Sequence, residues 1–330
     1  MQKKIALITG GAGFIGSHTV DLLLKKNFFV RVIDNYSGGH KNNLIDHHGN
    51  SNLEIHEIDI RSLSNDASVF KDVNYVFHFA GIGDIVPSIE DPVKYFDVNV
   101  QGTIKVLECS KRAGVQKFLY AASSSCYGKA NTPTSESHAI NPQYPYALSK
   151  YQGEQATMHW ADVYGLPVTS IRIFNAYGTR VRTTGAYGAV FGVFLKQKLE
   201  KKKFTIVGDG TQKRDFVYVT DVANAFYLAA QSKKSKKIYN LGGGCPQTIN
   251  RLVELLNGPV EYLPKRPGEP EVTWADINLI KKDLNWDPKI AFEDGVSIMV
   301  SNIEDWANAP LWDKKKITVA TQNWFKYLSK

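Results

Sequence analysis

Lys3-Lys-Ile-Ala-Leu-Ile-Thr9 runs directly into Gly10-Gly-Ala-Gly13-Phe-Ile-Gly16, and this segment carries more structural information than any other in the chain. The apolar run predicts a short buried strand, and the residues from Ser17 to Lys26 continue as a helix. Val30-Arg-Val-Ile-Asp34 predicts a second strand, which ends in an acid 18 residues after Gly16. Strand, glycine turn, helix, strand and acid in this order predict a dinucleotide-binding unit rather than a simple tight turn.

Each part of this unit has a physical task. The glycines allow the backbone to turn tightly and to approach a pyrophosphate, and the helix N-terminus offers free N–H groups and a favourable dipole. Asp34 would accept hydrogen bonds from the adenosine ribose hydroxyls. Its charge would also repel a 2′-phosphate, so we expect NAD rather than NADP.

A second pattern lies about 130 residues further on, in Tyr144-Pro-Tyr-Ala-Leu-Ser-Lys150. Tyr146 and Lys150 are four residues apart, which on a helix places both side chains on one face. An ammonium group beside a phenol stabilises the phenolate and lowers the phenol pKa, so the pair predicts a usable base. Tyr-x-x-x-Lys alone is a weak pattern, and its weight comes from the glycine turn that precedes it.

Taken together, Gly10, Gly13, Gly16 and Tyr146-x-x-x-Lys150 resemble the extended short-chain dehydrogenase/reductase family, and the resemblance covers nearly the whole chain. Within that family the chain looks most like nucleotide-sugar epimerases of the UDP-galactose and UDP-N-acetylhexosamine 4-epimerase type. The further matching segments are Glu57-Ile-Asp59-Ile-Arg61, His78-Phe-Ala80-Gly81, Asn99-Val-Gln-Gly-Thr103, Ser123-Ser-Ser-Cys-Tyr127-Gly128, Arg172-Ile-Phe-Asn175-Ala-Tyr-Gly178, Gly208-Asp-Gly-Thr-Gln-Lys-Arg214, Arg266-Pro-Gly-Glu269 and Trp274-Ala-Asp276.

The resemblance implies which residues bind NAD and which act on the substrate. Ser123 matches the catalytic serine beside Tyr146 and Lys150, and Ser124 is its rival. Ser124 and Ser125 stand where related dehydratases carry an Asp-Glu pair, and related decarboxylases carry a glutamate at the second of these positions. A hydroxyl cannot replace a carboxylate in proton transfer at neutral pH, so simple epimerisation is favoured. The expected cofactor-binding residues are Gly10, Gly13, Phe14, Ile15, Gly16, Asp34, Asn35, Ser37, Gly38, Asp59, Ile60, Phe79, Ala80, Gly81, Asn99, Ala121, Tyr146, Lys150 and Phe174.

Substrate residues are implied by the same resemblance. Arg214 and Arg266 match arginines that clamp a diphosphate, for which the planar guanidinium is well suited. Asp84 departs from the family pattern and could contact a sugar hydroxyl or repel a sugar acid. Thr273 matches a gate beside the 2-substituent of the sugar, and its small size suggests that N-acetylhexosamines fit. The expected substrate-binding residues are Asp84, Ser123, Ser124, Asn175 at the diphosphate, Ala189 and Val190 with Phe191 at the base, Arg214, Arg266, Glu269 at the ribose, and Thr273.

The alternation of patterns predicts an α/β fold, a Rossmann-type doubly wound parallel sheet with a smaller α/β substrate-binding domain. The NAD-binding domain is expected to comprise 1–175 plus 219–245, and the nucleotide-sugar-binding domain 176–218 plus 246–330, interleaved in sequence. Thr220 is expected to cap a helix running to Gln231. The tail from about 307 to 330 has no assigned role. We predict strands at 3–9, 29–34, 53–58, 75–79, 117–122, 167–173, 204–207 and 237–241, and helices at 14–26, 92–113, 144–165 and 188–203.

Composition limits the other possibilities. The net charge of 40 − 32 = +8 resides in short lysine clusters (196–203, 233–237 and 314–316), which we expect to be solvated because no nucleic-acid-binding motif accompanies them. Three scattered cysteines, no long apolar run and a first strand that begins near Met1 indicate a cytoplasmic protein without a disulfide framework or a membrane partner. We expect no metal site, and the family resemblance implies a homodimer.

Two alternatives stay open beside the epimerase. One is a net oxidoreductase of the same fold, which would release a 4-keto product and NADH instead of retaining its cofactor. The other is a noncatalytic dinucleotide sensor, against which Ser123, Tyr146 and Lys150 argue because a sensor needs none of them.

Overall fold

A parallel seven-stranded sheet forms the centre of the computed structural model, which describes residues 3–181 and 190–329. Its strand order is β11-β6-β5-β4-β1-β2-β3, and every neighbouring pair is parallel. The predicted strands of this sheet are confirmed to within two residues at their ends. They are β1 (Ile5–Thr9), β2 (Phe29–Asp34), β3 (Leu53–Glu57), β4 (Tyr75–His78), β5 (Lys117–Ser123), β6 (Val168–Ile173) and β11 (Lys237–Leu241).

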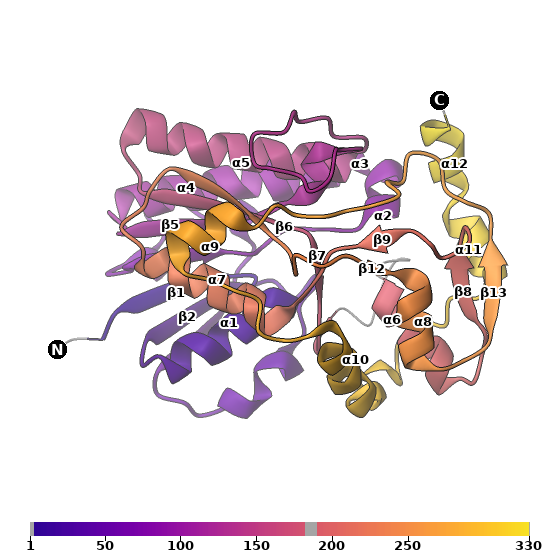
Figure 1. The fold of residues 1–330 in the computed structure, drawn as a ribbon. Helices are drawn as coiled ribbons and strands as arrows, with labels where there is room; N and C mark the ends of the chain where they lie inside the picture. The colour runs from indigo at the N-terminus through magenta and orange to yellow at the C-terminus, as the bar shows by residue number, and fades with distance from the viewer. Residues whose placement is uncertain (1–2, 182–189, 330) are drawn as a thin grey trace.

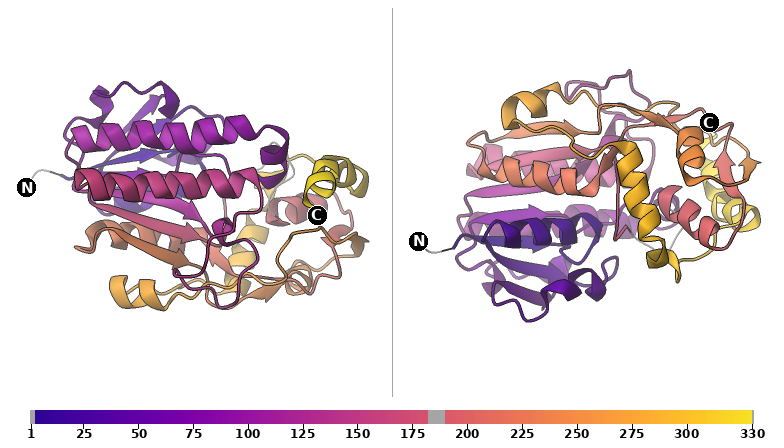
Figure 2. Two further views of the ribbon diagram at one scale, coloured as in Figure 1. Left: turned by 90° about the horizontal axis from the view of Figure 1, so that it is seen from above. Right: turned by 60° about the horizontal axis from the view of Figure 1, so that its bottom comes forward.

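Helices cover both faces of this sheet (Figure 1). On one face α1 (Phe14–Lys25) packs beside α7 (Val219–Gln231), and on the other α4 (Thr103–Arg112) packs beside α5 (Pro145–Tyr164), as Figure 2 shows. Every residue of β4 and β6 is buried, as expected for strands of a parallel sheet that is covered on both faces. The predicted Rossmann-type fold is therefore confirmed.

The helix predicted at 92–113 is not regular. It consists of α3 (Pro92–Phe96), a π-helical turn (Asp97–Gly102) and α4. The π turn contains Asn99, which is 1% exposed and whose side chain bonds the backbone of Ile82 in both directions, at 2.9 and 3.0 Å. Such turns insert one extra residue per turn and are frequent at functional sites. Here the turn directs Asn99 at the loop that follows β4.

The predicted cap of α7 is wrong. Thr220 lies inside the helix, which begins at Val219 directly after strand residue Tyr218, and no side chain caps it. Asp221 in the first turn accepts instead the backbone N–H groups of Lys289 and Ile290, at 2.9 and 3.0 Å. The first turn of α7 thus binds the backbone of the Lys289–Ile290 segment, 68 residues further along the chain.

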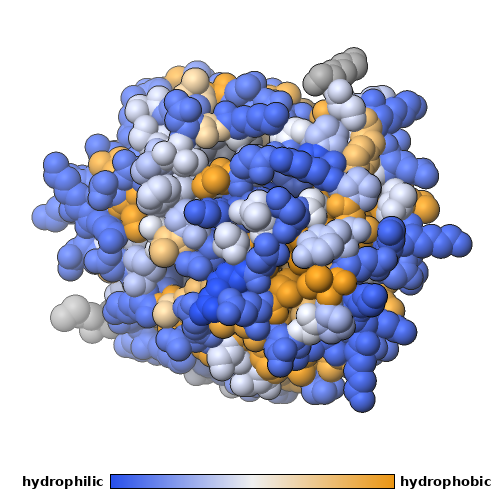
Figure 3. Space-filling model, turned by 45° about the vertical axis from the view of Figure 1, so that its right-hand side comes forward, coloured by the Kyte–Doolittle hydropathy of each residue, from blue (hydrophilic) through white to orange (hydrophobic). Residues whose placement is uncertain are grey.

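Part of the remaining chain forms a smaller assembly around a separate buried cluster, drawn from residues between Tyr177 and Ala309. Its side of the molecule is largely hydrophilic, with hydrophobic side chains gathered in a few areas (Figure 3). The division into two interleaved domains stays a prediction. The elements of the structure not yet named, in either part, are α2 (Ile85–Glu90), β7 (Asn175–Tyr177), α6 (Val190–Leu199), β8 (Phe204–Val207), β9 (Lys213–Arg214), β10 (Phe216–Tyr218), β12 (Gln247–Thr248), α8 (Ile249–Leu256), β13 (Val260–Leu263), α9 (Asn278–Leu284), α10 (Phe292–Ser301), α11 (Lys314–Ala320) and α12 (Gln322–Leu328), with 3₁₀ helices at Lys41–His47, Ile60–Ser62, Ser68–Phe70, Ser124–Tyr127 and Ile303–Trp306.

One lysine departs from the expected solvated clusters. Lys196 on α6 is 7% exposed, and its ammonium donates to the Glu200 carboxylate and to the Ala307 carbonyl, each at 2.7 Å. It lies on the buried side of α6, where the stem packs and the charged head finds acceptors. Among the helices of the described residues, none is long and apolar enough to cross a membrane.

Candidate active site

The glycine turn between β1 and α1 tolerates no side chain. Gly10 has a φ of +68°, and a Cβ there would lie 2.7 Å from the Ala80 backbone nitrogen. A Cβ on Gly16 would lie 2.1 Å from the Gly10 carbonyl oxygen. No side chain caps α1 at Gly13, so the first N–H groups of the helix are not engaged by a cap. This combination fits the pyrophosphate of a dinucleotide.

Asp34 ends β2 and is 7% exposed. Its carboxylate accepts the N–H of Ala12 at 2.9 Å and that of Tyr36 at 2.8 Å, which ties the glycine turn to the strand end. Burial raises the pKa of this carboxyl group, and the two N–H bonds oppose the increase. A buried acid that braces the turn in this way fits the ribose-binding role predicted for it.

The neighbouring predicted residues form a polar cluster at the same edge. Asn35 donates to Asp59 at 3.0 Å and accepts from the Ser37 hydroxyl at 2.7 Å. Arg61 beside Asp59 lowers the pKa of that carboxyl group to about 2. A Cβ on Gly38 would meet nothing within 4 Å, so the surface beyond this cluster is open.

The other predicted cofactor residues lie where strands of the sheet end. Phe79 follows β4 and packs on the Phe226 ring with centroids 4.7 Å apart, and the Ala80 N–H donates to the Thr9 hydroxyl at 3.1 Å. Ala121 lies in β5, and Phe174 follows β6. Carboxyl ends of parallel strands meet at one edge of a sheet, which is where ligands of open α/β folds bind.

Helix α5 carries the Tyr-Lys pair to that same edge. A Cβ on Gly83 would lie 3.9 Å from the Tyr146 hydroxyl oxygen, and a Cβ on Gly81 would lie 3.6 Å from the Lys150 ammonium nitrogen. Both side chains therefore border the Gly81–Gly83 loop after β4. The Lys150 ammonium also lies 4.5 Å from the centroid of the Tyr120 ring, so an aromatic face supports its charge.

The pKa of the tyrosine shifts in the direction opposite to our prediction. Burial raises the pKa of Tyr146, the hydroxyls of Ser123 and Ser125 lower it, and the charge of Asp84 raises it further. Burial also lowers the pKa of Lys150 to about 7. The sequence pattern predicts the proximity of a cation but not the burial of both groups, and burial is the largest influence on the pKa of each.

Ser123 is the last residue of β5, and its Oγ lies 2.7 Å from the Oγ of Ser125. Ser125 also donates its backbone N–H to Ser123 at 3.2 Å, while Ser124 begins the 3₁₀ helix that follows. Sequence reasoning missed Ser125 as a site residue. The available signal was its i+2 position after a strand-ending serine, a spacing typical of hydroxyl-stabilised turns.

A buried ion pair fixes α5 against the sheet, and sequence reasoning missed it too. Glu154, one turn beyond Lys150, pairs with Arg172 of β6 at 2.5 Å, and the two side chains are 3% and 4% exposed. Arg172 also donates to the Tyr127 hydroxyl at 2.7 Å. Breaking a pair this deeply buried is strongly destabilising, so it holds the helix register that presents Tyr146 and Lys150.

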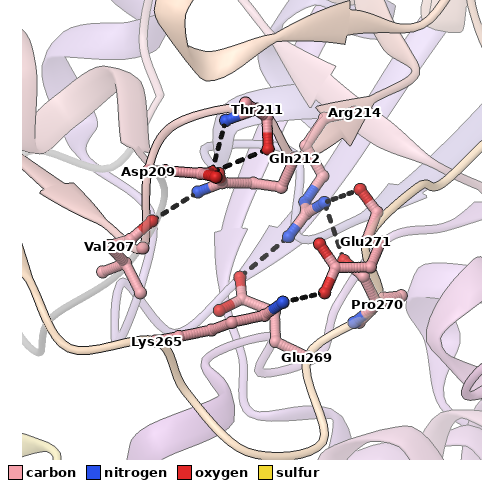
Figure 4. A pocket seen from close by; sticks show the side chains of 10 residues that line it. Val207, Asp209, Thr211, Gln212, Arg214, Lys265, Glu269, Pro270 and Glu271 are labelled. Carbon is pink, nitrogen blue, oxygen red and sulfur yellow. Dashed lines mark hydrogen bonds and ion pairs between the residues drawn. The ribbon is translucent and has the colours of Figure 1, made fainter.

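The predicted nucleotide residues meet only in part. Arg214 and Glu269 form an ion pair of 2.9 Å inside a cavity of about 150 Å³ (Figure 4). Arg266 does not line this cavity; it lies against the ring of Trp324, with its guanidinium carbon 5.6 Å from the ring centroid. The cavity is also lined by Val207, Gly208, Asp209, Thr211, Gln212, Lys265, Pro270 and Glu271.

Two further predicted residues contact each other, whereas the residues expected at the base are described only in part. The Thr273 hydroxyl donates to the Asn175 side chain at 2.8 Å. Val190 begins α6, and Ala189 lies outside the described residues. Phe191 is 2% exposed and stacks on Tyr177 at 4.7 Å within a core cluster, because its helix face is apolar. The base pocket therefore stays a prediction.

Tyr144 lies between Tyr146 and the Arg214–Glu269 cavity. It lies immediately before α5, and its ring is stacked on Tyr146 with centroids 6.3 Å apart. Burial raises its pKa, the charges of Tyr146 and Glu269 raise it further, and Ser125 and Arg214 lower it. These effects place Tyr144 within electrostatic reach of both residue sets. Tyr144 therefore contacts the catalytic candidate Tyr146 directly and feels the charges of the nucleotide-binding candidates Arg214 and Glu269.

Known proteins share this architecture. Residues 6–242 match the model of the NAD dependent epimerase/dehydratase family. A Methanocaldococcus jannaschii protein, provisionally named a UDP-glucose 4-epimerase, is 38% identical over 303 residues, which cover 89% of this chain and 97% of that protein. The structure of UDP-N-acetylglucosamine 4-epimerase from Methanobrevibacter ruminantium M1 in complex with UDP-N-acetylmuramic acid has a TM-score of 0.85 and 33% identity, covering 92% of this chain and 100% of that one.

UDP-glucuronic acid 4-epimerase from Bacillus cereus, solved in complex with UDP-glucuronic acid and NAD, also has a TM-score of 0.85, at 30% identity, covering 91% of this chain and 99% of that one. The family match and the length of the similar region are consistent with the glycine turn, the buried Asp34 and the shared helix face of Tyr146 and Lys150 in this structure. The chain therefore belongs to the NAD dependent epimerase/dehydratase family.

Proposed function

We propose that this protein is an NAD-dependent epimerase that inverts carbon 4 of a nucleoside-diphosphate hexose, with UDP-hexoses and UDP-N-acetylhexosamines as the first candidates. The observation that carries the proposal is the shared border of Tyr146 and Lys150 on the Gly81–Gly83 loop, at the sheet edge onto which the glycine turn opens. Tyr144 extends this site towards the Arg214–Glu269 cavity, where a nucleotide would lie.

NAD is held by the residues of the sheet edge. The uncapped start of α1 and the glycines receive the pyrophosphate, and Asp34 receives the ribose. When bound, NAD supplies a hydride acceptor and donor at carbon 4, which allows inversion through a transient ketone on the sugar.

Tyr146 acts as the general base and then the general acid at the 4-oxygen of the sugar. Its pKa is raised by burial, so its base form must be favoured by neighbours. Lys150 supplies positive charge, and the Ser123 and Ser125 hydroxyls supply hydrogen bonds. Ser123 also donates to the oxygen on which negative charge develops.

Epimerisation rather than elimination is favoured by the side chains after Ser123. Ser124 and Ser125 carry no carboxylate, so these two positions offer no acid to protonate a leaving hydroxyl. Asp84 lies at the start of α2 and its charge reaches Tyr146, which disfavours a sugar acid. Thr273, held by Asn175, leaves room for a 2-N-acetyl group.

We also propose a homodimer in the cytoplasm. Helices α4 and α5 lie side by side on one face of the sheet (Figure 2), and α5 exposes Leu148, Val163 and Tyr164 there at 36%, 55% and 50%. Exposed apolar side chains at both ends of a long surface helix support such an interface.

The test is incubation of the purified protein with NAD and, separately, UDP-glucose, UDP-galactose, UDP-N-acetylglucosamine, UDP-N-acetylgalactosamine and UDP-glucuronate. Products are followed by NMR and cofactor reduction by absorbance. A new 4-epimer without accumulating NADH supports the proposal and names the sugar. Steady NADH release would instead identify a net oxidoreductase, and no product from any sugar would contradict the proposed activity on these substrates.

A further inference from the structure

The C-terminal helices contact both walls of the proposed site. Helix α12 packs against α2, which directly follows Asp84, and stands beside it in Figure 1. Trp324 of α12 is 4% exposed, and its indole N–H donates to the Pro267 carbonyl at 2.7 Å. This bond joins the last part of the chain to the segment that carries Arg266 and Glu269.

The same indole ring faces a residue of each wall. On one side the Arg266 guanidinium carbon lies 5.6 Å from the ring centroid, within the range of a cation–π contact. On another, the Tyr144 ring lies with its centroid 6.1 Å away, and Tyr144 in turn stacks on Tyr146. Trp324 is therefore the link in a continuous series of rings from the catalytic tyrosine to Arg266.

The C-terminal helices border a cavity close to this link. This cavity of about 290 Å³ is lined by residues of α11 and α12 on one side and of β8, β13 and Arg266 on the other. Few side chains anchor the two helices: Ile317, Thr321 and Trp324 are the buried ones, at 2%, 3% and 4% exposed. Removal of the Trp324 ring would therefore free the Arg266 segment more than it would disturb the sheet.

We propose that Trp324 is a positioning residue of the substrate site, which holds Arg266 and Tyr144 at a fixed separation so that the guanidinium is presented to the diphosphate of the sugar nucleotide. The inference rests on the proposed function for the diphosphate and adds a role for the tail. A guanidinium held on an aromatic face loses less conformational freedom when it binds phosphate, and preorganisation of this kind appears as affinity.

The test measures UDP and uridine binding to the NAD-loaded protein by calorimetry, in Trp324→Ala, Trp324→Phe and Tyr327→Ala. Trp324→Ala should weaken UDP binding by about tenfold or more while uridine affinity stays within about twofold, because only UDP carries the diphosphate. Trp324→Phe keeps a ring but loses the bond to Pro267, so it should fall between. Tyr327 lies on the same helix at 51% exposed and serves as the matched aromatic control, with no change expected.

A double-mutant experiment with Arg266 distinguishes a positioning role of Trp324 from general damage to the protein. In an Arg266→Gln background, Trp324→Ala or Trp324→Phe should change UDP affinity by less than about twofold. With an epimerised sugar, Trp324→Phe should raise KM and leave kcat nearly unchanged. Equal losses for UDP and uridine, or full additivity with Arg266→Gln, would overturn the inference.

Binding is measured without turnover, so the two proposals fail separately. If the effects of the Trp324 and Arg266 substitutions on UDP affinity are additive and the Trp324 variants still epimerise the sugar, only the positioning role is contradicted. A protein that binds UDP through coupled Trp324 and Arg266 but makes no 4-epimer would contradict only the reaction, and a wild type that does not bind UDP would contradict both.

Discussion

The cofactor side of the site rests on one sheet, whereas the nucleotide side is assembled from segments far apart in the sequence. The glycine turn, Asp34 and Ser123 stand at the ends of β1, β2 and β5, and each is held by regular strand pairing. Arg214 belongs to the two-residue strand β9, and Glu269 lies in an irregular segment after β13. The first side is therefore part of the folding core, and the second can change without unfolding it. Substitutions on the two sides should differ in whether stability changes along with binding.

The largest effect is expected where the two sides meet. Tyr146→Phe keeps the ring that stacks on Tyr144 but removes the hydroxyl, and general acid–base catalysis contributes about 10²–10⁴-fold. Turnover should fall by roughly 10³-fold while NAD content and UDP affinity stay unchanged, as measured by NMR rates, absorbance and calorimetry. Tyr95→Phe, in a second ring 6.4 Å from Tyr146, is the control. A near-normal rate in Tyr146→Phe would remove this residue from the mechanism.

A stability change with pH would test the buried lysine. The pKa of Lys150 is lowered from 10.5 to about 7 by burial, so between these values the unfolded chain binds more protons than the folded one. Stability must then rise with pH across roughly 7 to 10.5, by on the order of a few kcal/mol. Lys150→Met lacks this dependence. Its melting temperature should exceed that of the wild type most at pH 6 to 7, and the difference should shrink towards pH 10.

Calorimetric scans at several pH values would measure this difference, with the exposed Lys105→Met on α4 as the control. A Lys150→Met advantage that is the same at pH 6 and pH 10 would mean that the ammonium is not desolvated.

The backbone of the cofactor side should resist a single added methyl group. Gly10→Ala combines a φ of +68° with a Cβ 2.7 Å from the Ala80 nitrogen, for a cost of about 2–4 kcal/mol. Melting temperature and NAD content should fall together. Gly49 has a φ of +77° and open space around its Cβ position, so Gly49→Ala isolates the strain and should cost only about 1 kcal/mol. Equal losses in both variants would mean that the contact with Ala80 is not tight.

Sequence reasoning succeeded on the cofactor side because its information is local. Strand, turn and helix follow one another within 34 residues, and a period of four fixes the common face of Tyr146 and Lys150. It failed where burial determines the pKa, as for Tyr146, whose pKa is raised. Desolvation depends on residues that the sequence pattern does not contain. The place of Arg266 beside Trp324 is set by a contact across 58 residues, which no periodicity encodes.

The substrate side should lose binding without losing stability. Arg214→Gln removes the cation expected at the diphosphate and leaves the negative charge of Glu269 in the same cavity without its ion-pair partner, so UDP affinity should fall by about 10–100-fold. The melting temperature and NAD content should change little. Arg251→Gln on α8 is the matched control, since Arg251 pairs with Glu254 and Glu293 at the surface. A large fall in melting temperature for Arg214→Gln would place this side in the folding core and break the comparison.

The smallest effect is expected from Asp84, which acts on the site by charge. Its carboxylate raises the pKa of Tyr146 and would repel a uronate, so Asp84→Asn should favour both the base form of the tyrosine and acidic sugars. A single charge near the protein surface contributes about 1 kcal/mol, which corresponds to a several-fold change. We expect the ratio of kcat/KM for UDP-glucuronate to that for UDP-glucose to rise about threefold to tenfold. The rise in rate with pH should also begin at a lower pH.

Asp91→Asn is the control, because it gives the same change in net charge at the far end of α2, where asparagine still caps α3. It should change neither the sugar ratio nor the pH dependence of the rate. An unchanged sugar ratio in Asp84→Asn would assign the exclusion of uronates to shape instead of charge, and would move the search for specificity to Thr273 and Asn175.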